Sequence, residues 1–155
     1  MLSTAYGVSV TMSSQAVRDS INAAVETLAA PWPFYDLSDY HTIDEVLLTI
    51  QEAAVLIQYV AADDTVQTIG GEGNQGWEET GTATLHLVTP TGVDSDPVVE
   101  KGDEIRTGIR GRRVASDVVV ESCSPFTDFG GAGTGVNGAV HSWAANIFYY
   151  RRDCG

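Results

Sequence analysis

The sequence predicts a single α+β domain in which two main helices pack on one face of an antiparallel or mixed sheet of about four to five strands. The chain has 155 residues and 43% of them are hydrophobic, a length and composition that suit one domain with one core. Apolar residues recur at helical spacing in some segments and at alternate positions in others. No linker or internal repeat divides the chain, so residues 1–155 are interpreted as one unit.

The first predicted helix covers residues 13–30. Serines at its start can cap a helix. Its apolar residues share one face, at spacings of three and four: Val17, Ile21, Ala24, Val25 and Leu28. Pro31 and Pro33 end the helix. Residues 1–12 form an N-terminal extension that lacks the basic and apolar regions of a signal peptide, so the chain is expected to stay in the cytosol.

Residues 34–50 are ambiguous, because Phe34, Tyr35 and Leu37 could begin a strand and residues 42–50 suit either a short helix or another strand. Residues 53–71 are apolar and rich in β-branched side chains, which predicts a long strand. Residues 77–90 alternate in polarity and predict its antiparallel partner, with Ala83, Leu85 and Leu87 on one face.

The second predicted helix lies in residues 95–111. Asp96 suits the cap position and Pro97 the first helical position, and Gly111 is a natural stop. Its core-facing residues follow helical spacing: Val98, Ile105 and Ile109. Residues 112–126 and 140–152 predict two further strands, and the second alternates clearly, with His141, Trp143, Ala145, Ile147 and Tyr149 on one side.

A glycine-rich run at residues 129–140 contains Gly133, Gly135 and Gly138 at the spacing of a dinucleotide-binding fingerprint. That fingerprint needs a helix that begins inside it and a ribose-binding carboxylate about 20 residues further on. The residues after it have strand spacing, and too few of them remain. The run is therefore interpreted as a loop, and the hairpins at residues 69–77 and 127–137 are expected to project from the ends of the sheet.

No catalytic, metal or cofactor site is expected. The three histidines lie far apart without the spacing of a zinc helix: His41, His86 and His141. Asp63 with Asp64, or Glu78 with Glu79, could offer paired carboxylates, but neighbouring residues on a strand point to opposite faces and would not converge. The sequence has neither a nucleophile elbow nor a P-loop lysine.

The two cysteines, Cys123 and Cys154, lack C-x-x-C spacing, which favours a reduced structural role, although a disulfide between them stays open. No apolar run reaches the ~18 residues that a bilayer span needs, so no membrane contact is expected.

Charge is distributed unevenly along the chain. The formal net charge is −13, and residues 19–100 hold most of the acidic residues and no lysine or arginine. Such a field repels phosphate, so specific nucleic-acid binding is disfavoured. The acidic residues either form a solvated surface or meet residues 106–113 on a second copy, since complementary patches suit head-to-tail contacts.

Three quoted stretches carry a family resemblance. Residues 81–109, "GTATLHLVTPTGVDSDPVVEKGDEIRTGI", run from a strand through a Pro-Thr-Gly turn into a helix. "SPF" at 124–126 and "IFYYRR" at 147–152 end the later strands. With the first helix, this order over residues 13–152 resembles the tail terminator proteins of long-tailed bacteriophages.

The resemblance implies a structural virion protein of the tail–neck junction. Tail terminators close the end of the tail tube as a ring of about six subunits, stop its elongation and dock onto the head-completion neck, while genomic DNA passes through without specific binding. The implied partners are further copies of this chain, the tail tube protein and the neck protein. Two other functions stay open: another neck, head–tail joining or minor tail protein, and a binding module unrelated to phages.

Residue roles follow from this expectation. The candidate contacts to neighbouring subunits or the tail tube are Trp77, Phe129, Arg106, Arg110, Arg112 and Arg113. The candidate acidic lining of a DNA channel is Asp63, Asp64, Glu72, Glu78 and Glu79. Aromatic residues such as Trp77 and Phe129 are more often packed in a core or at a sheet edge than in an interface, and Arg112 and Arg113 could instead stabilise the dipole of the second helix.

Overall fold

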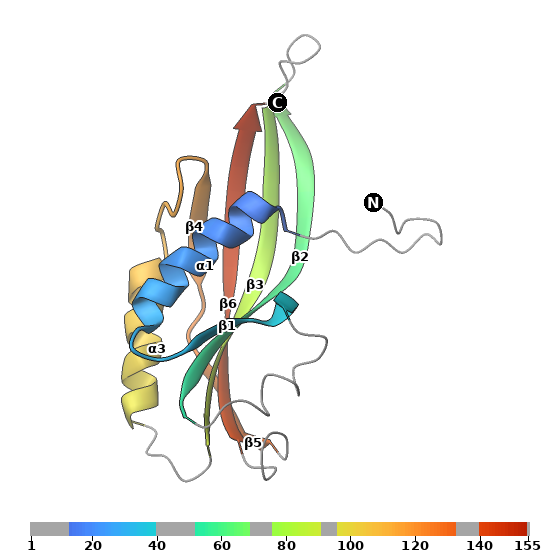
Figure 1. Ribbon diagram of the computed structural model, residues 1–155. Coiled ribbons are helices and arrows are strands. Elements are labelled where there is room, and N and C mark those ends of the chain that lie inside the picture. Colours follow the sequence, from blue (N-terminus) through green and yellow to red (C-terminus); the bar gives the residue numbers. More distant parts are fainter. Residues whose placement is uncertain (1–12, 40–51, 69–75, 91–95, 133–139, 155) are drawn as a thin grey trace, which may run out of the picture.

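A six-stranded mixed sheet with two helices on one face forms the body of the computed structural model (Figure 1). The structure describes residues 13–39, 52–68, 76–90, 96–132 and 140–154. The main strand order is β1-β2-β3-β6-β4, and β5 pairs with β6. The predicted α+β class is confirmed, and the sheet is somewhat larger than the four to five strands expected.

Helix α1 spans Gln15–Ala29, close to the predicted bounds. Its buried residues are Val17, Ile21, Ala24, Val25 and Ala29, and Leu28 packs partly buried against them. Ser14 occupies the predicted cap position, but its side chain makes no cap bond. The Ser14 N–H instead donates to the Glu79 carboxylate at 3.1 Å, which ties the start of the helix to the sheet.

The ambiguous region after α1 begins with a short strand, β1, at Phe34–Asp36, and a single 3-10 turn, η1, at Leu37–Asp39. β1 runs parallel to β2 (Ala54–Thr68), which makes the sheet mixed. β2 pairs antiparallel with β3 (Gly76–Pro90) from Ala54↔Val88 to Thr68↔Gly76, which confirms the predicted pair of long strands. Residues 40–51 and the expected hairpin tip at 69–75 lie outside the described residues.

Helix α3 spans Asp96–Ile109, and the predicted core residues Val98, Ile105 and Ile109 are buried. It begins at Asp96, one residue before the predicted first turn. Gly111 follows it with φ +70, a left-handed conformation that suits glycine at a helix end. Lys101 is also buried, and its Nζ donates to the Ala30 carbonyl at 2.9 Å, so a cation that the sequence did not single out joins the two helices.

The last strands are β4 (Val118–Cys123), β5 (Thr127–Ala132) and β6 (Val140–Cys154). β5 corrects the interpretation of the run at residues 129–140 as a loop, because residues 127–132 form a strand that pairs with β6 from Thr127↔Ala144 to Ala132↔Val140. The three glycines of the fingerprint, Gly133, Gly135 and Gly138, lie outside the described residues.

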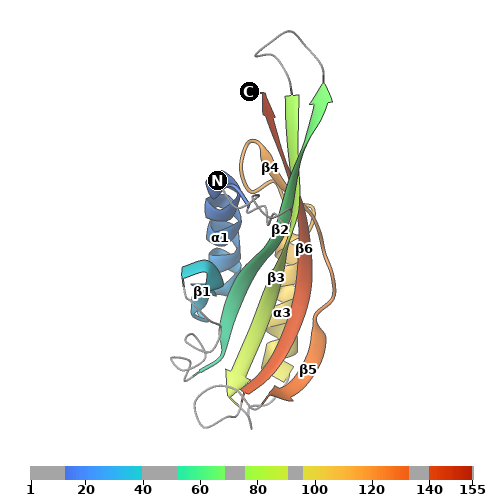
Figure 2. The same ribbon diagram turned by 90° about the vertical axis from the view of Figure 1, so that its right-hand side faces the viewer.

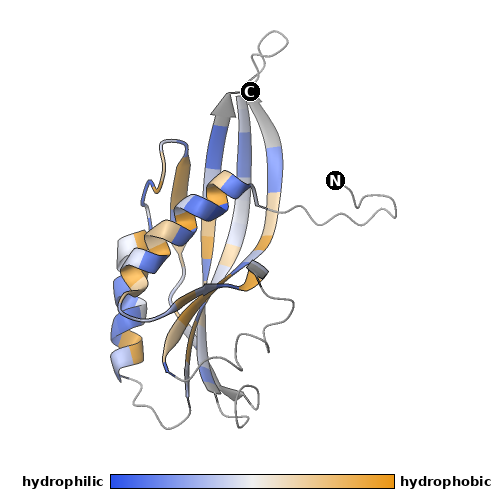
Figure 3. Cartoon of the chain, in the orientation of Figure 1, coloured by the Kyte–Doolittle hydropathy of each residue, from blue (hydrophilic) through white to orange (hydrophobic). Residues whose placement is uncertain are grey.

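The core lies between the helices and one face of the sheet. Alternate strand residues supply it, among them Val55, Ile57, Ala83, Leu85, Leu87, Trp143, Ala145, Ile147 and Tyr149. This face is called the helix face below, and the opposite side is called the open face. At one end of the sheet, β2, β3 and β6 continue past α1 (Figure 2). Figure 3 shows hydrophilic residues on these extensions, where the helices no longer cover the sheet.

Candidate assembly interface

The arginine turn, residues 110–113, connects α3 to β4 at one side of the sheet. Arg110, Arg112 and Arg113 are exposed. The Val120 N–H donates to the Arg112 carbonyl at 2.8 Å, and the Val114 N–H donates to the Val118 carbonyl at 3.0 Å. These bonds fix the turn along the outer side of β4, where its side chains face solvent.

The four predicted arginines do not behave alike. Arg106 donates from Nε to the Cys123 carbonyl at 3.0 Å, so it joins α3 to β4 inside the domain. That bond commits the Nε–H of Arg106 inside the domain, and its role as a contact residue stays a prediction. Arg113 donates to the Ser116 carbonyl at 2.8 Å. Within the described residues, Arg110 and Arg112 have no side-chain bond or ion pair.

Asp117, the nearest acidic residue to the arginine turn in the sequence, already has an arginine partner. Asp117 accepts a bond from Arg151 Nε at 2.7 Å. This bond holds the pKa of Asp117 below its usual value. Asp117 is therefore not free to pair with the arginine turn.

The acidic residues lie on the other side of the sheet. Asp63 and Asp64 are exposed on β2. Glu78 pairs with Arg152 at 3.0 Å on the open face, and Glu72 lies outside the described residues. Asp63 and Asp64 are therefore the members of the predicted acidic set that are described, exposed and unpaired within the described chain.

Glu79 corrects the predicted acidic lining. It is 9% exposed, and its Oε2 accepts bonds from the Tyr149 hydroxyl at 2.9 Å and from the Ser14 N–H at 3.1 Å. Ser13 Oγ lies 2.5 Å from the same hydroxyl. Burial raises the pKa of Tyr149 well above its usual range, so the phenol stays protonated and can donate. Glu79 therefore holds α1 on the sheet and cannot line a channel.

Of the two predicted aromatic contacts, Trp77 has a described side chain and Phe129 does not. Trp77 lies at the start of β3 and is 39% exposed, so its ring is available to a partner. Phe129 lies within β5, where a loop was expected, and its side chain is outside the described part of the structure.

The chain matches no protein-family model, and no curated protein matches it.

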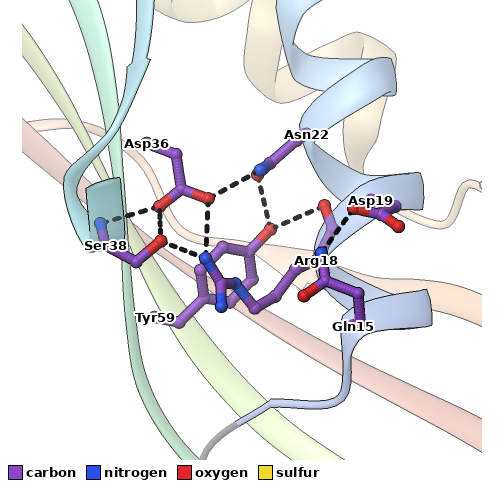
Figure 4. Close-up of polar contacts among 7 residues, drawn as sticks. All are labelled: Gln15, Arg18, Asp19, Asn22, Asp36, Ser38 and Tyr59. Carbon is purple, nitrogen blue, oxygen red and sulfur yellow. Dashed lines mark hydrogen bonds and ion pairs between the residues drawn. The ribbon is translucent and has the colours of Figure 1, made fainter.

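The structure contains a polar cluster beneath α1 that the sequence does not predict (Figure 4). Arg18, the one basic residue before Lys101, pairs with Asp36 at 3.3 Å. Asp36 is 8% exposed and also accepts bonds from Asn22 Nδ2 at 2.7 Å and from the Ser38 N–H at 2.9 Å. Tyr59 donates to Asn22 Oδ1 at 2.7 Å. The cluster joins α1, β1, η1 and β2, so we assign it a structural role.

Burial alone would raise the pKa of Asp36, but the bonds from Ser38 and Asn22 and the charge of Arg18 outweigh it and lower the pKa. Asp36 is therefore ionised at neutral pH. The isolated arginine in an acidic half of the chain was the only sequence signal for this cluster.

Side chains that could take part in a reaction lie near the start of β6. His141 Nε2 lies 2.6 Å from Asp128 Oδ1, and the His141 ring stacks on Trp143 with centroids 4.0 Å apart. Thr89 is opposite His141 across the strands, and its hydroxyl has no hydrogen-bond partner within the described residues. It is only 1% exposed, so this hydroxyl offers no open nucleophile. No group of three or more potential metal ligands occurs within the described ranges.

Among the described residues, neither the length nor the composition of any helix suits a membrane span.

His86 lies on the open face of β3. Burial lowers the pKa of its imidazole, which favours the neutral form.

Cys123 is buried and free, in agreement with the predicted reduced role. In the sheet, Cys123 of β4 lies opposite Ile147 of β6. Cys154 lies at the end of β6, seven residues after Ile147, which places it roughly 23 Å from Ile147 at 3.3 Å per residue. A disulfide needs Cα atoms within about 7 Å, so these two cysteines cannot join.

Burial raises the pKa of the Cys123 thiol to about 11. We expect a Cys154→Ser variant to react with a disulfide reagent at pH 8 at least about tenfold more slowly than the same variant unfolded in denaturant, because the thiolate is the reactive form. Absorbance of the released thiolate measures the rate. Equal rates for folded and unfolded protein would show that Cys123 is accessible.

Proposed function

We propose that this chain is a structural virion protein that closes the end of a phage tail tube as a ring, stops tube elongation and docks the tail to the head-completion neck. The observation that carries the proposal is the resemblance of residues 81–109, 124–126 and 147–152 to tail terminators. In the fold, these segments form the β3–α3 unit, the residues after β4 and the end of β6. The protein would then reside at the tail–neck junction of the virion.

The charge distribution supports assembly of copies head to tail. The arginine turn lies on the β4 side of the sheet, and Asp63 and Asp64 lie on β2, beyond β6 and β3. Two different and complementary surfaces on one molecule suit a heterologous contact, which closes into a ring when the rotation between copies permits. The net charge of −13 suits a channel that DNA passes without being held.

Light scattering and negative-stain images of the purified chain, alone and with tail tubes, test the proposal. A closed ring of about six subunits attached to tube ends is the expected result. A ring of about twelve would favour an adaptor nearer the portal. A chain that stays monomeric and never attaches to tubes would contradict the proposal and favour a binding module of another kind.

A further inference from the structure

One row of cross-strand partners runs from the arginine turn to Asp63 on β2. Each residue in it is the cross-strand partner of the next: Arg113, Val119, Tyr150, Thr80 and Asp63. Arg113 and Asp63 therefore lie at the same level along the strands, on opposite sides of the domain. Figure 1 shows β4 and β2 on opposite sides of β6 and β3. A second copy placed beside the first, without a shift along the strands, brings the two charges together.

The arginines of the turn divide between the two faces of the sheet. Val114 packs against the core, so it points to the helix face. Residues next to each other along an extended chain point to opposite faces. Arg113 therefore lies on the open face, and Arg112 lies on the helix face.

The aspartates divide in the same way. Asp64 pairs with Glu79, whose side chain bonds to Ser14 at the start of α1, so Asp64 lies on the helix face. Asp63 pairs with Thr80 and lies on the open face. Each face of the β2 edge thus carries one carboxylate, and each face of the arginine turn carries one matching guanidinium.

The edge of β2 is open along the same stretch. β1 pairs with β2 only over Val55–Ile57, and within the described residues no strand lies beside β2 beyond that point. Open strand edges readily pair with other chains. On the other side of the domain, the backbone groups of Arg112 and Val114 bond to β4, so those of Arg113 point outward.

We propose that the β2 edge of one copy lies beside the arginine turn of the next, with Arg113 opposite Asp63 on the open face and Arg112 near Asp64 on the helix face. This contact rests on the proposed ring and names its interface. The two facing segments run in the same direction, so the sheet of one copy continues into the next.

Two double variants of the full chain test this contact. Asp63→Lys/Asp64→Lys makes both sides of the domain basic, and Arg112→Glu/Arg113→Glu makes both sides acidic. Sedimentation velocity at low salt and images of tube ends measure assembly of each variant alone. We expect the apparent dissociation constant for self-association to rise about 100-fold or more in both, because like charges then face each other.

An equimolar mixture of the two variants is the decisive sample. Every contact between unlike copies then joins opposite charges, so assembly is expected to return with the two variants alternating. Glu100→Lys/Asp103→Lys is the matched control, because it changes the charge equally at exposed positions of α3 and is expected to assemble like the wild type.

The outcomes separate this contact from the ring itself. If the wild type and both double variants form rings, the proposed contact is wrong and the proposed ring is retained. The same conclusion follows if the wild type forms a ring and the equimolar mixture of the two variants does not assemble. If the control also loses assembly, net charge and not this contact controls association, and the contact is again wrong. A wild type that is monomeric both in solution and on tubes overturns the contact and the ring together.

Discussion

Replacing Gly81 with alanine is expected to lower the free energy of unfolding by about 3 kcal/mol, because the added methyl group has no room. A Cβ atom there would lie 2.3 Å from the Tyr149 hydroxyl oxygen and 2.6 Å from the Ala61 carbonyl oxygen. The backbone of Ala61 is part of β2, and Tyr149 is buried with its hydroxyl bonded to Glu79. Neither neighbour can move without breaking strand pairing or the bond that anchors α1.

Urea unfolding followed by circular dichroism measures this loss. Gly108→Ala is the matched control, because its Cβ would meet only the end of the Leu28 side chain, at 2.5 Å, and Leu28 is partly buried and able to turn. The control is expected to cost less than about 1 kcal/mol, since alanine also favours the helix. Equal effects of the two substitutions would show that the close packing of Tyr149 on Gly81 is not a constraint on the fold.

Replacing Asp36 with alanine is expected to lower the free energy of unfolding by about 3 kcal/mol, because it leaves Arg18 without its partner in a largely buried site. The substitution also removes the acceptor for Asn22 and Ser38. Chemical denaturation at neutral pH measures the effect. The double variant Arg18→Met/Asp36→Leu removes both charges and is expected to recover most of the loss.

The pH dependence of the same site gives an independent check. The pKa of Asp36 is lowered in the folded protein, so its contribution is complete above the usual carboxyl pKa of 3.8 and is lost as the pH falls through the folded value. The stability difference between wild type and Asp36→Ala should therefore shrink in acid. A difference that stays constant from neutral pH to about pH 2 would contradict the role given to the ionised carboxylate.

Local patterns predicted the elements that depend on neighbouring residues. Helix α1 and the pairing of β2 with β3 follow from apolar spacing within short stretches, and both are present. The sequence does not predict β5, because its glycines conceal the alternating pattern of a strand. Its extended conformation depends on pairing with β6, which lies later in the chain. The sequence leaves the conformation of β1 ambiguous, because only the pairing of β1 with β2 decides it.

The candidate site shows the same limit. The sequence predicted that Glu78 and Glu79 point to opposite faces, but which one is buried depends on where α1 crosses the sheet, and that is a tertiary property. Charge spacing alone does not separate Arg106 from Arg110, Arg112 and Arg113, because its bond to the Cys123 carbonyl joins two elements that are distant in the sequence. Charge clustering did identify Arg112 and Arg113, and only the strand register places them level with the aspartates of β2.

The length of tail tubes grown in the presence of this chain tests the proposed function most directly. Purified tail tube protein is polymerised with and without the chain, and tube lengths are measured in negative-stain images. A terminator is expected to give tubes that stop growing with a ring at one end, and the ratio of chain to tube protein should set their mean length. Tubes of the same length distribution with and without the chain, and with bare ends, would contradict it.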